Sequence, residues 1–179
     1  MIRVKNLSKT YEGEKTPTIK NVSFMLKDTG LYFIKGESGS GKTTLATILG
    51  CMDDNFDGDV FFDEKSYKAM SKNEKSEFRL NNVGFSFQGG FMDGLCTVED
   101  EVMKSFFGSS LSKEERKDRL SKLLIYFELN NYQKRKINEL SGGEKKRISL
   151  IKAIIKKPKL LLVDEPTAGL NEKLAHKTM

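Results

Sequence analysis

The segment GESGSGKTT, residues 36–44, carries the clearest structural signal in the sequence. It matches the phosphate-loop pattern, in which a glycine-rich segment ends in a lysine followed by serine or threonine. The glycines let the backbone curl so that consecutive N–H groups point inward and hold phosphate oxygens. An apolar run, residues 31–34, precedes the loop, and residues 43–49 have helix-forming character and stop at Gly50. The sequence therefore predicts a buried strand, a phosphate loop and a helix in that order.

The end of the loop carries the most specific chemistry. Lys42 supplies a positive charge to the β- and γ-phosphates of a nucleotide, and the Thr43 hydroxyl is a ligand for Mg²⁺. The helix that follows adds the positive end of its dipole. A glycine-rich turn that binds nothing is the alternative, and the Lys-Thr pair in a strand–loop–helix context argues against it. The candidate nucleotide-binding residues are Gly36, Ser38, Gly39, Ser40, Gly41, Lys42, Thr43 and Thr44.

A second chemical signal is LLLVDE, residues 160–165, where a predicted buried strand ends in two carboxylates. Such an arrangement has few structural uses. Beside a phosphate loop, Asp164 can hold Mg²⁺ through its water shell. Glu165 can polarise the water that attacks the γ-phosphate. Alone this pattern is weak evidence, but together with the phosphate loop it indicates nucleotide hydrolysis.

The remaining segments predict an α/β core with a helical insert. Apolar residues alternate at 2–4 and 22–26, as in half-buried strands, and 58–62 and 83–87 are further strand candidates. Helical signals dominate residues 97–131. There a capping-box pattern precedes an apolar stripe, and a second helix after Ser141 is expected to end at Pro158. The residues of these patterns are Ser112 and Glu115 for the capping box, Leu120, Leu123, Leu124 and Phe127 for the first stripe, and Ile148, Ile151 and Ile155 for the second.

Composition narrows the class of protein. The 179 residues are 37% apolar and 31% charged, which is typical of one soluble globular domain. No apolar run approaches the roughly 20 residues of a membrane span, and the start lacks a signal-peptide core, so a cytoplasmic chain is expected. Cys51 and Cys96 have no metal-ligand spacing and are expected to be reduced. The net charge of +6 could serve nucleic acid or an anionic membrane, but acids interleave with the basic residues at 113–119, which favours a solvated helix face.

The segment LSGGE, residues 140–144, distinguishes this chain from many other phosphate-loop proteins. It is similar to the signature motif of ATP-binding cassette (ABC) proteins, and the chain resembles their nucleotide-binding domain over essentially its whole length, with the motifs in the same order. In this family the phosphate loop is called Walker A. The resemblance implies an α/β fold of the P-loop NTPase (ABC ATPase) type with an inserted helical subdomain. We expect a single domain at 1–179, with a nucleotide-binding core at about 1–88 and 158–179 and a helical subdomain at about 89–157.

The resemblance also implies roles for single residues. Tyr11 lies where the family carries an aromatic residue that stacks on adenine, for which a flat π face is sufficient. Gln88 matches the glutamine loop, which reaches toward Mg²⁺ and the attacking water and links to the membrane partner. Residues 167–171 resemble the loop through which two nucleotide sites communicate. The family's signature turn, which caps a γ-phosphate, corresponds to Ser141, Gly142, Gly143 and Glu144.

Two domains of this family pack head to tail, so that the phosphate loop of one chain and the signature turn of the other close on the same ATP. The resemblance therefore implies a dimer with a second ATPase domain, with ATP and Mg²⁺ as cofactors. It also implies a separate membrane-spanning permease subunit, because no span is expected in this chain. The chain would then lie in the cytoplasm, peripheral at the inner face of the cell membrane, and no nucleic acid is expected as a partner.

The sequence departs from the family at three places. The signature has Glu144 where Gln is more usual, and Glu is a known variant at this position. Asn171 stands where the family usually has Asp, so a negative charge is lost. The family also continues beyond the point where this sequence ends, through a further core strand and a switch histidine. His176 lies too close behind Glu165 to take that role. We therefore expect a chain that lacks carboxyl-terminal core strands and that binds ATP but hydrolyses it poorly; turnover as fast as that of a full-length domain would contradict this expectation.

Three functions remain open at this point. The leading one is the ATPase subunit of a transporter, and residues 38–53 and 83–88 look most like the bacterial exporter and lipoprotein-release branch, including peptide or bacteriocin export. The second is a soluble ABC ATPase acting on ribosomes, DNA or cofactor assembly, which salt-dependent binding to nucleic acid would favour. The third is a nucleotide-binding remnant with little hydrolysis.

Overall fold

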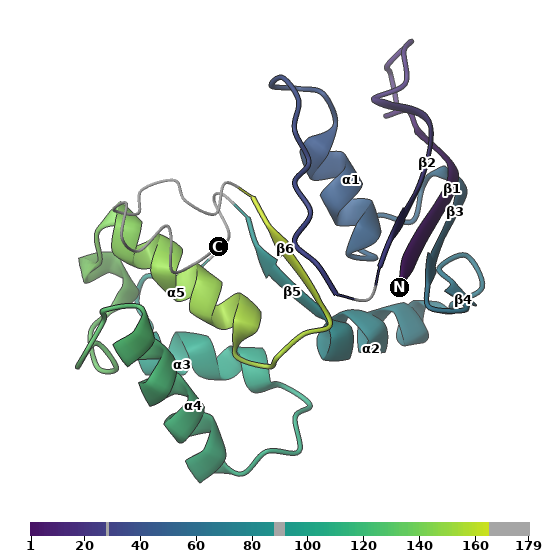
Figure 1. Ribbon diagram of the computed structural model, residues 1–179. Coiled ribbons are helices and arrows are strands. Elements are labelled where there is room, and N and C mark those ends of the chain that lie inside the picture. The colour runs from purple at the N-terminus through teal and green to yellow at the C-terminus, as the bar shows by residue number, and fades with distance from the viewer. Residues whose placement is uncertain (28, 88–91, 165–179) are drawn as a thin grey trace. The chain divides into compact units, whose positions relative to one another are not determined.

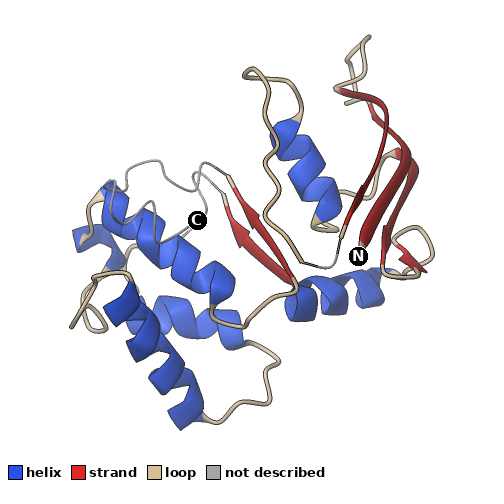
Figure 2. Ribbon diagram, viewed as in Figure 1, coloured by secondary structure: helices blue, strands red, loops and turns tan. Residues whose placement is uncertain are grey.

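The computed structural model describes residues 1–27, 29–87 and 92–164. The chain divides into two compact units, an amino-terminal unit (residues 1–79) and a carboxyl-terminal unit (residues 80–179). Figure 1 labels the helices and strands, and Figure 2 shows that both units contain helices as well as strands. The α/β class predicted from the sequence is therefore confirmed.

The amino-terminal unit contains an antiparallel sheet with the strand order β2 (Ile19–Leu26), β1 (Ile2–Lys9), β3 (Asp57–Phe62) and β4 (Lys65–Ser66). Alternation along β1 places Ile2 and Val4 in the core, and Leu7 is also buried, after an irregularity in the register between Val4 and Leu7. Ile2 pairs with Leu26 on one side and with Phe62 on the other. The strands predicted at 2–4, 22–26 and 58–62 are confirmed as β1 (Ile2–Lys9), β2 (Ile19–Leu26) and β3 (Asp57–Phe62), and β4 (Lys65–Ser66) extends the sheet.

Helix α1 (Lys42–Leu49) follows the phosphate loop and ends at Gly50, as predicted. Its first residue follows Gly41, whose φ of +86° is a conformation that glycine adopts without a Cβ penalty. A Cβ on Gly41 would also lie 2.9 Å from the carbonyl oxygen of Thr18. The position therefore requires glycine for two independent reasons. Helix α2 (Lys72–Asn82) begins in the same unit, and its Phe78 ring lies edge-on to Phe62, with 4.9 Å between centroids.

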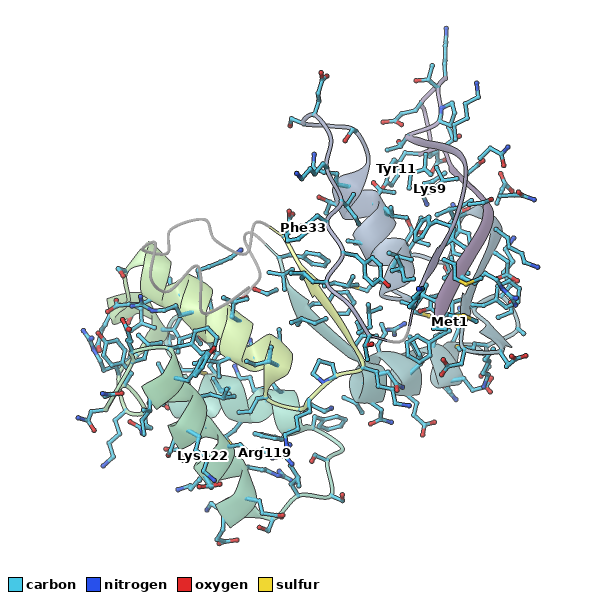
Figure 3. All side chains as sticks on the ribbon, in the orientation of Figure 1. Met1, Lys9, Tyr11, Phe33, Arg119 and Lys122 are labelled. Carbon is cyan, nitrogen blue, oxygen red and sulfur yellow. The ribbon has the colours of Figure 1, made fainter. Side chains whose placement is uncertain are left out.

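The segment before the phosphate loop differs from its prediction. Residues 31–34 were expected to form a buried strand, but they form no strand, and Leu31 and Phe33 are 62% and 57% exposed. Figure 3 labels Phe33 on this segment. An apolar run becomes a buried strand only when neighbouring strands satisfy its backbone groups and cover its side chains. No ladder among the described residues pairs with 31–34, so that part of the prediction is wrong for this structure.

The carboxyl-terminal unit combines a parallel strand pair with three α-helices in its described part. Strand β5 (Val83–Ser86) pairs in register with β6 (Leu160–Val163). The helices are α3 (Val98–Met103), α4 (Lys113–Tyr126) and α5 (Gly142–Ile154), with short 3-10 turns at Lys104–Phe106 and Ile137–Glu139. These elements confirm the strands predicted near 83–87 and 160–163 and the helices predicted within 97–131 and after Ser141.

The helices share one apolar core. Ser112 and Glu115 form the predicted capping box, with the Ser112 N–H donating to the Glu115 carboxylate at 2.8 Å. Most residues of the two predicted stripes are buried in this core: Leu120, Leu124, Phe127, Ile148, Ile151 and Ile155, with Leu123 partly buried against it.

Two details differ from the sequence prediction. Helix α5 ends at Ile154 rather than at Pro158, and Lys157 then takes a left-handed conformation with φ +57°. Strand β6 is less buried than its composition suggests, because Leu161 is 43% exposed. Within the described residues β6 has one ladder partner, β5, and a strand with one partner is covered less than a central one.

Candidate nucleotide-binding site

The phosphate loop is curled in the way its glycines allow. Gly39 and Gly41 have φ values of +79° and +86°, and the Ser40 N–H donates to the Glu37 carbonyl at 3.2 Å. The Lys42 ammonium donates to the carbonyl oxygens of Gly36, at 3.0 Å, and Glu37, at 2.6 Å. The ammonium is thus held over the loop by neutral acceptors. Because a phosphate is a stronger acceptor for a charged donor, these two bonds can be exchanged for bonds to a nucleotide.

Tyr11 is held beside the first turn of α1 by a hydrogen bond. Its hydroxyl shares a hydrogen bond with the Thr44 hydroxyl at 3.0 Å, and its ring is 41% exposed. The Lys9 ammonium lies 4.9 Å from the ring centroid and also donates to the Asp53 carboxylate and the Asn55 carbonyl. Figure 3 shows Lys9 and Tyr11 close together. Adenine stacking on Tyr11 stays a prediction, and the cation over one ring face would leave the other face for a base.

The signature turn forms the start of α5. The Ser141 hydroxyl accepts from the Glu144 N–H at 3.3 Å, and the Glu144 carboxylate accepts from the Ser141 N–H at 2.7 Å. Together the two bonds make a capping box. A Cβ on Gly142 would meet nothing within 4 Å, so this side of the turn is open. Space is therefore free beside the first residue of this 13-residue helix, and a helix start of this kind suits an anion.

Glu144 has a further partner that sequence reasoning missed. The Tyr132 hydroxyl donates to its carboxylate at 2.5 Å, and the Arg135 guanidinium lies 4.4 Å from the Tyr132 ring centroid. These hydrogen bonds, that of Tyr132 first and those of Ser141 next, lower the pKa of Glu144 to about 2. Since this is below its ordinary value of 4.5, the stability that Glu144 contributes is present above about pH 4.5 and is lost as the pH falls toward 2.

Asp164 follows the last residue of β6 and extends its pairing with β5. Its N–H donates to the Ser86 carbonyl at 2.9 Å, and its own carbonyl accepts from the Lys146 ammonium at 2.7 Å. The carboxyl ends of β5 and β6 thus lie together, as the parallel register requires. Gln88 and Glu165 lie outside the described residues, so their predicted roles stay predictions.

The predicted Mg²⁺ ligands have suitable chemistry. The Thr43 hydroxyl and the Asp164 carboxylate are hard oxygen donors, which Mg²⁺ prefers. In the described ranges no group of three or more His, Cys, Asp and Glu side chains could hold a metal ion. Mg²⁺ commonly takes one or two protein oxygens and completes its coordination with waters and nucleotide phosphates. Thr43 belongs to the amino-terminal unit and Asp164 to the carboxyl-terminal unit, and each donor taken by itself has the chemistry that Mg²⁺ prefers.

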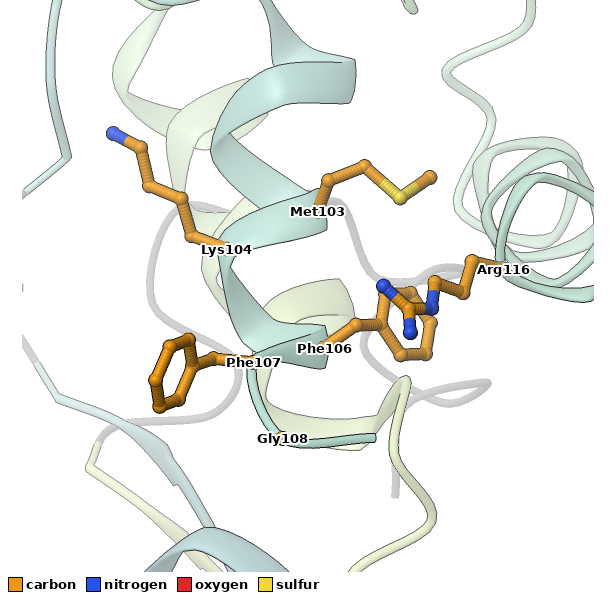
Figure 4. Close-up of a pocket in the computed structure, with 6 residues that line it drawn as sticks. All are labelled: Met103, Lys104, Phe106, Phe107, Gly108 and Arg116. Carbon is orange, nitrogen blue, oxygen red and sulfur yellow. The ribbon is translucent and has the colours of Figure 1, made fainter. Parts of the chain in front are cut away.

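A separate hollow of about 560 Å³ lies in the carboxyl-terminal unit. Its lining residues are Met103, Lys104, Phe106, Phe107, Gly108 and Arg116, as Figure 4 shows. The Arg116 guanidinium donates to the carbonyls of Leu111 and Ser109 and lies 5.7 Å from the Phe106 ring centroid. None of the predicted nucleotide-binding residues lines this hollow.

The described residues include no helix that is both long enough and apolar enough to span a membrane.

Comparisons with known proteins identify the family to which this chain belongs. The family model described as "ABC transporter" matches residues 19–168. The uncharacterized ABC transporter ATP-binding protein MJ0796 of Methanocaldococcus jannaschii is 34% identical over 185 residues, covering 100% of this chain and 79% of that protein. The lipoprotein-releasing system ATP-binding protein LolD of Buchnera aphidicola is 36% identical over 96% of this chain and 76% of its own length. The putative hemin import ATP-binding protein HrtA of Staphylococcus epidermidis is 35% identical over 98% of this chain and 80% of its own length.

Solved structures agree with the sequence relatives. The dimeric post-hydrolysis state of MJ0796 bound to ADP and Pi superposes with a TM-score of 0.90 at 32% identity, over 99% of this chain and 79% of that one. CbiO1 of Clostridium perfringens, part of the ABC transporter complex cbiONQ, gives a TM-score of 0.80 at 25% identity, over 98% of this chain and 69% of that one. This chain therefore belongs to the ABC transporter ATP-binding family, whose cassettes hydrolyse ATP.

Proposed function

We propose that this chain is the ATP-binding and ATP-hydrolysing subunit of a transporter and acts with a separate membrane-spanning subunit. The observation that carries the proposal is the presence, in one chain of this family, of a phosphate loop closed by Lys42 and an open helix start capped by Ser141. The first is suited to the phosphates of ATP, and the second to an anion that approaches from outside the chain.

The two half-sites are proposed to meet in a head-to-tail dimer. The phosphate loop of one copy and the Ser141 turn of the other would close on one ATP, so that nucleotide binding joins the copies and hydrolysis releases them. Dimeric structures of MJ0796, one with bound ADP and Pi, support the formation of a dimer. Thr43, Asp164 and Gln88 would hold Mg²⁺, which offsets the charge on the phosphates, and Glu165 would take the proton of the attacking water.

The direction of transport is proposed to be export. The name of LolD places that relative in lipoprotein release, in agreement with the resemblance at residues 38–53 and 83–88. The name of HrtA points to import, so the proposal of export rests on the comparison with LolD. The chain would work at the inner face of the cell membrane, and the membrane subunit would select the cargo.

The proposal is tested by reconstitution in lipid vesicles with a multi-span membrane protein that co-purifies with this chain. We expect ATP hydrolysis several-fold faster than that of the isolated chain, and we expect the Lys42→Met variant to remain inactive with the same partner. Unstimulated hydrolysis together with salt-sensitive binding to RNA or DNA would overturn the transporter assignment in favour of an ATPase that acts on nucleic acid.

A further inference from the structure

Helix α5 contacts the carboxyl ends of both strands in its unit. Figure 1 shows the helix running beside β5 and β6. The Lys146 ammonium donates to the Asp164 carbonyl at 2.7 Å, at the end of β6. The hydroxyls of Ser149 and Ser86 share a hydrogen bond of 3.0 Å at the end of β5. Ser86 is fully buried and lies two residues before Gln88.

The helix is also held rigidly against its surroundings. A Cβ on Gly84 would lie 2.1 Å from the Ala153 carbonyl oxygen, so the absence of a side chain on β5 lets α5 approach the strand closely. Farther along α5, the Lys152 ammonium donates to Glu101 of α3, a carboxylate that is only 2% exposed and that also accepts from Lys104 at 2.7 Å. Contacts at several points along α5 therefore tie the helix to both strand ends and to α3.

Lys146 acts on the backbone beside the candidate catalytic carboxylate. The carbonyl that it binds belongs to the peptide bond between Asp164 and Glu165. The N–H of the same Asp164 residue is held by the Ser86 carbonyl at 2.9 Å. Asp164 is therefore fixed from both sides of its backbone, and the Lys146 bond is the stronger kind because its donor is charged.

We propose that Lys146 is a positioning residue for ATP hydrolysis, which ties the signature turn to the backbone at Asp164 and Glu165. Ser141 and Lys146 are five residues apart on one helix, about 7.5 Å along its axis. A γ-phosphate that engages Ser141 from a second copy would press on the same rigid helix whose ammonium holds Asp164. The inference rests on the proposed function, and it assigns the coupling between the two half-sites to one side chain.

Lys146→Met tests this role, because methionine keeps the apolar stem and removes the donor. We expect kcat to fall about tenfold while the KM for ATP stays within about twofold, since Lys146 has no predicted phosphate contact. Lys146→Arg, which retains a charged donor, is expected to restore most of the rate. Lys145→Met is the matched control, one residue earlier on the same helix, and is expected to hydrolyse ATP at the wild-type rate.

Hydrogen exchange at the Asp164 amide gives a second readout that needs no turnover. We expect that amide to exchange about tenfold faster in Lys146→Met than in wild type and Lys145→Met, because the Asp164 backbone loses one of its two anchors. A wild-type kcat together with unchanged exchange in Lys146→Met would overturn the inference, as would an equal loss in Lys145→Met. If the wild-type chain failed to bind ATP, the proposed function would fail, and amide exchange would still decide whether Lys146 holds Asp164.

Discussion

Lys42→Met is expected to weaken ATP binding by about 100-fold while leaving the fold intact. The Lys42 ammonium is held over the phosphate loop by two carbonyl oxygens, at 3.0 and 2.6 Å, so it is already positioned for a phosphate. A hydrogen bond from a charged donor contributes about 1.5–3 kcal/mol, and the upper end of that range corresponds to about 100-fold in Kd. Isothermal titration with Mg·ATP measures the change.

Lys35→Met is the matched control for this substitution. It removes the same charge from the same loop region, seven residues earlier, and is expected to change the Kd by less than about threefold, because Lys35 precedes the phosphate loop and has no predicted phosphate contact. Equal weakening in both variants would mean that the loop attracts ATP by net charge alone, and the assignment of Lys42 would then be wrong.

Gly84→Ala is expected to lower the free energy of unfolding by about 3 kcal/mol, the upper end of the usual range for overpacking. The added Cβ would lie 2.1 Å from the Ala153 carbonyl oxygen and 2.8 Å from Pro158 Cγ. The first of these atoms belongs to the backbone of α5, so relief requires the helix to move away from β5. Urea unfolding followed by circular dichroism measures the loss.

The control for Gly84 is Gly94→Ala. A Cβ at Gly94 would lie 3.5 Å from the Asn138 Cβ, which is ordinary contact, and the backbone there does not have a positive φ. A change of less than about 0.5 kcal/mol is expected at this site. If Gly84→Ala were as stable as Gly94→Ala, the close packing of α5 on β5 would be wrong, and with it the rigid helix on which the Lys146 proposal depends.

Elements with local signals could be predicted from the sequence. Helix α5 could be predicted from the Ser141 cap and from the apolar stripe that follows it. The three residues of that stripe are buried: Ile148, Ile151 and Ile155. Residues 31–34 show the limit of this reasoning. Their composition is that of a buried strand, but a strand depends on partners elsewhere in the chain, and none of the described strands pairs with them.

The residues of the candidate site also fall into two groups, those in continuous motifs and those that only folding brings together. The loop from Gly36 to Thr43 and the turn at Ser141 are continuous motifs, so the first could be proposed from its own pattern and the second from its resemblance to the ABC signature. The contacts that orient them join residues far apart in the sequence, with Glu144 12 positions after Tyr132 and Asp164 18 positions after Lys146. No periodic pattern links such pairs, because only the folded chain brings them together.

We propose that one chain supplies two half-sites that close on ATP only between two copies. Sedimentation velocity of the Glu165→Gln variant with saturating Mg·ATP tests it most directly, because removal of the proposed base should preserve binding and block hydrolysis. We expect a dimer with ATP, a monomer with ADP, and a monomer with ATP when Ser141→Arg is added to obstruct the signature turn. A Glu165→Gln chain that binds ATP but stays monomeric, or that dimerises equally well with Ser141→Arg, would contradict the claim.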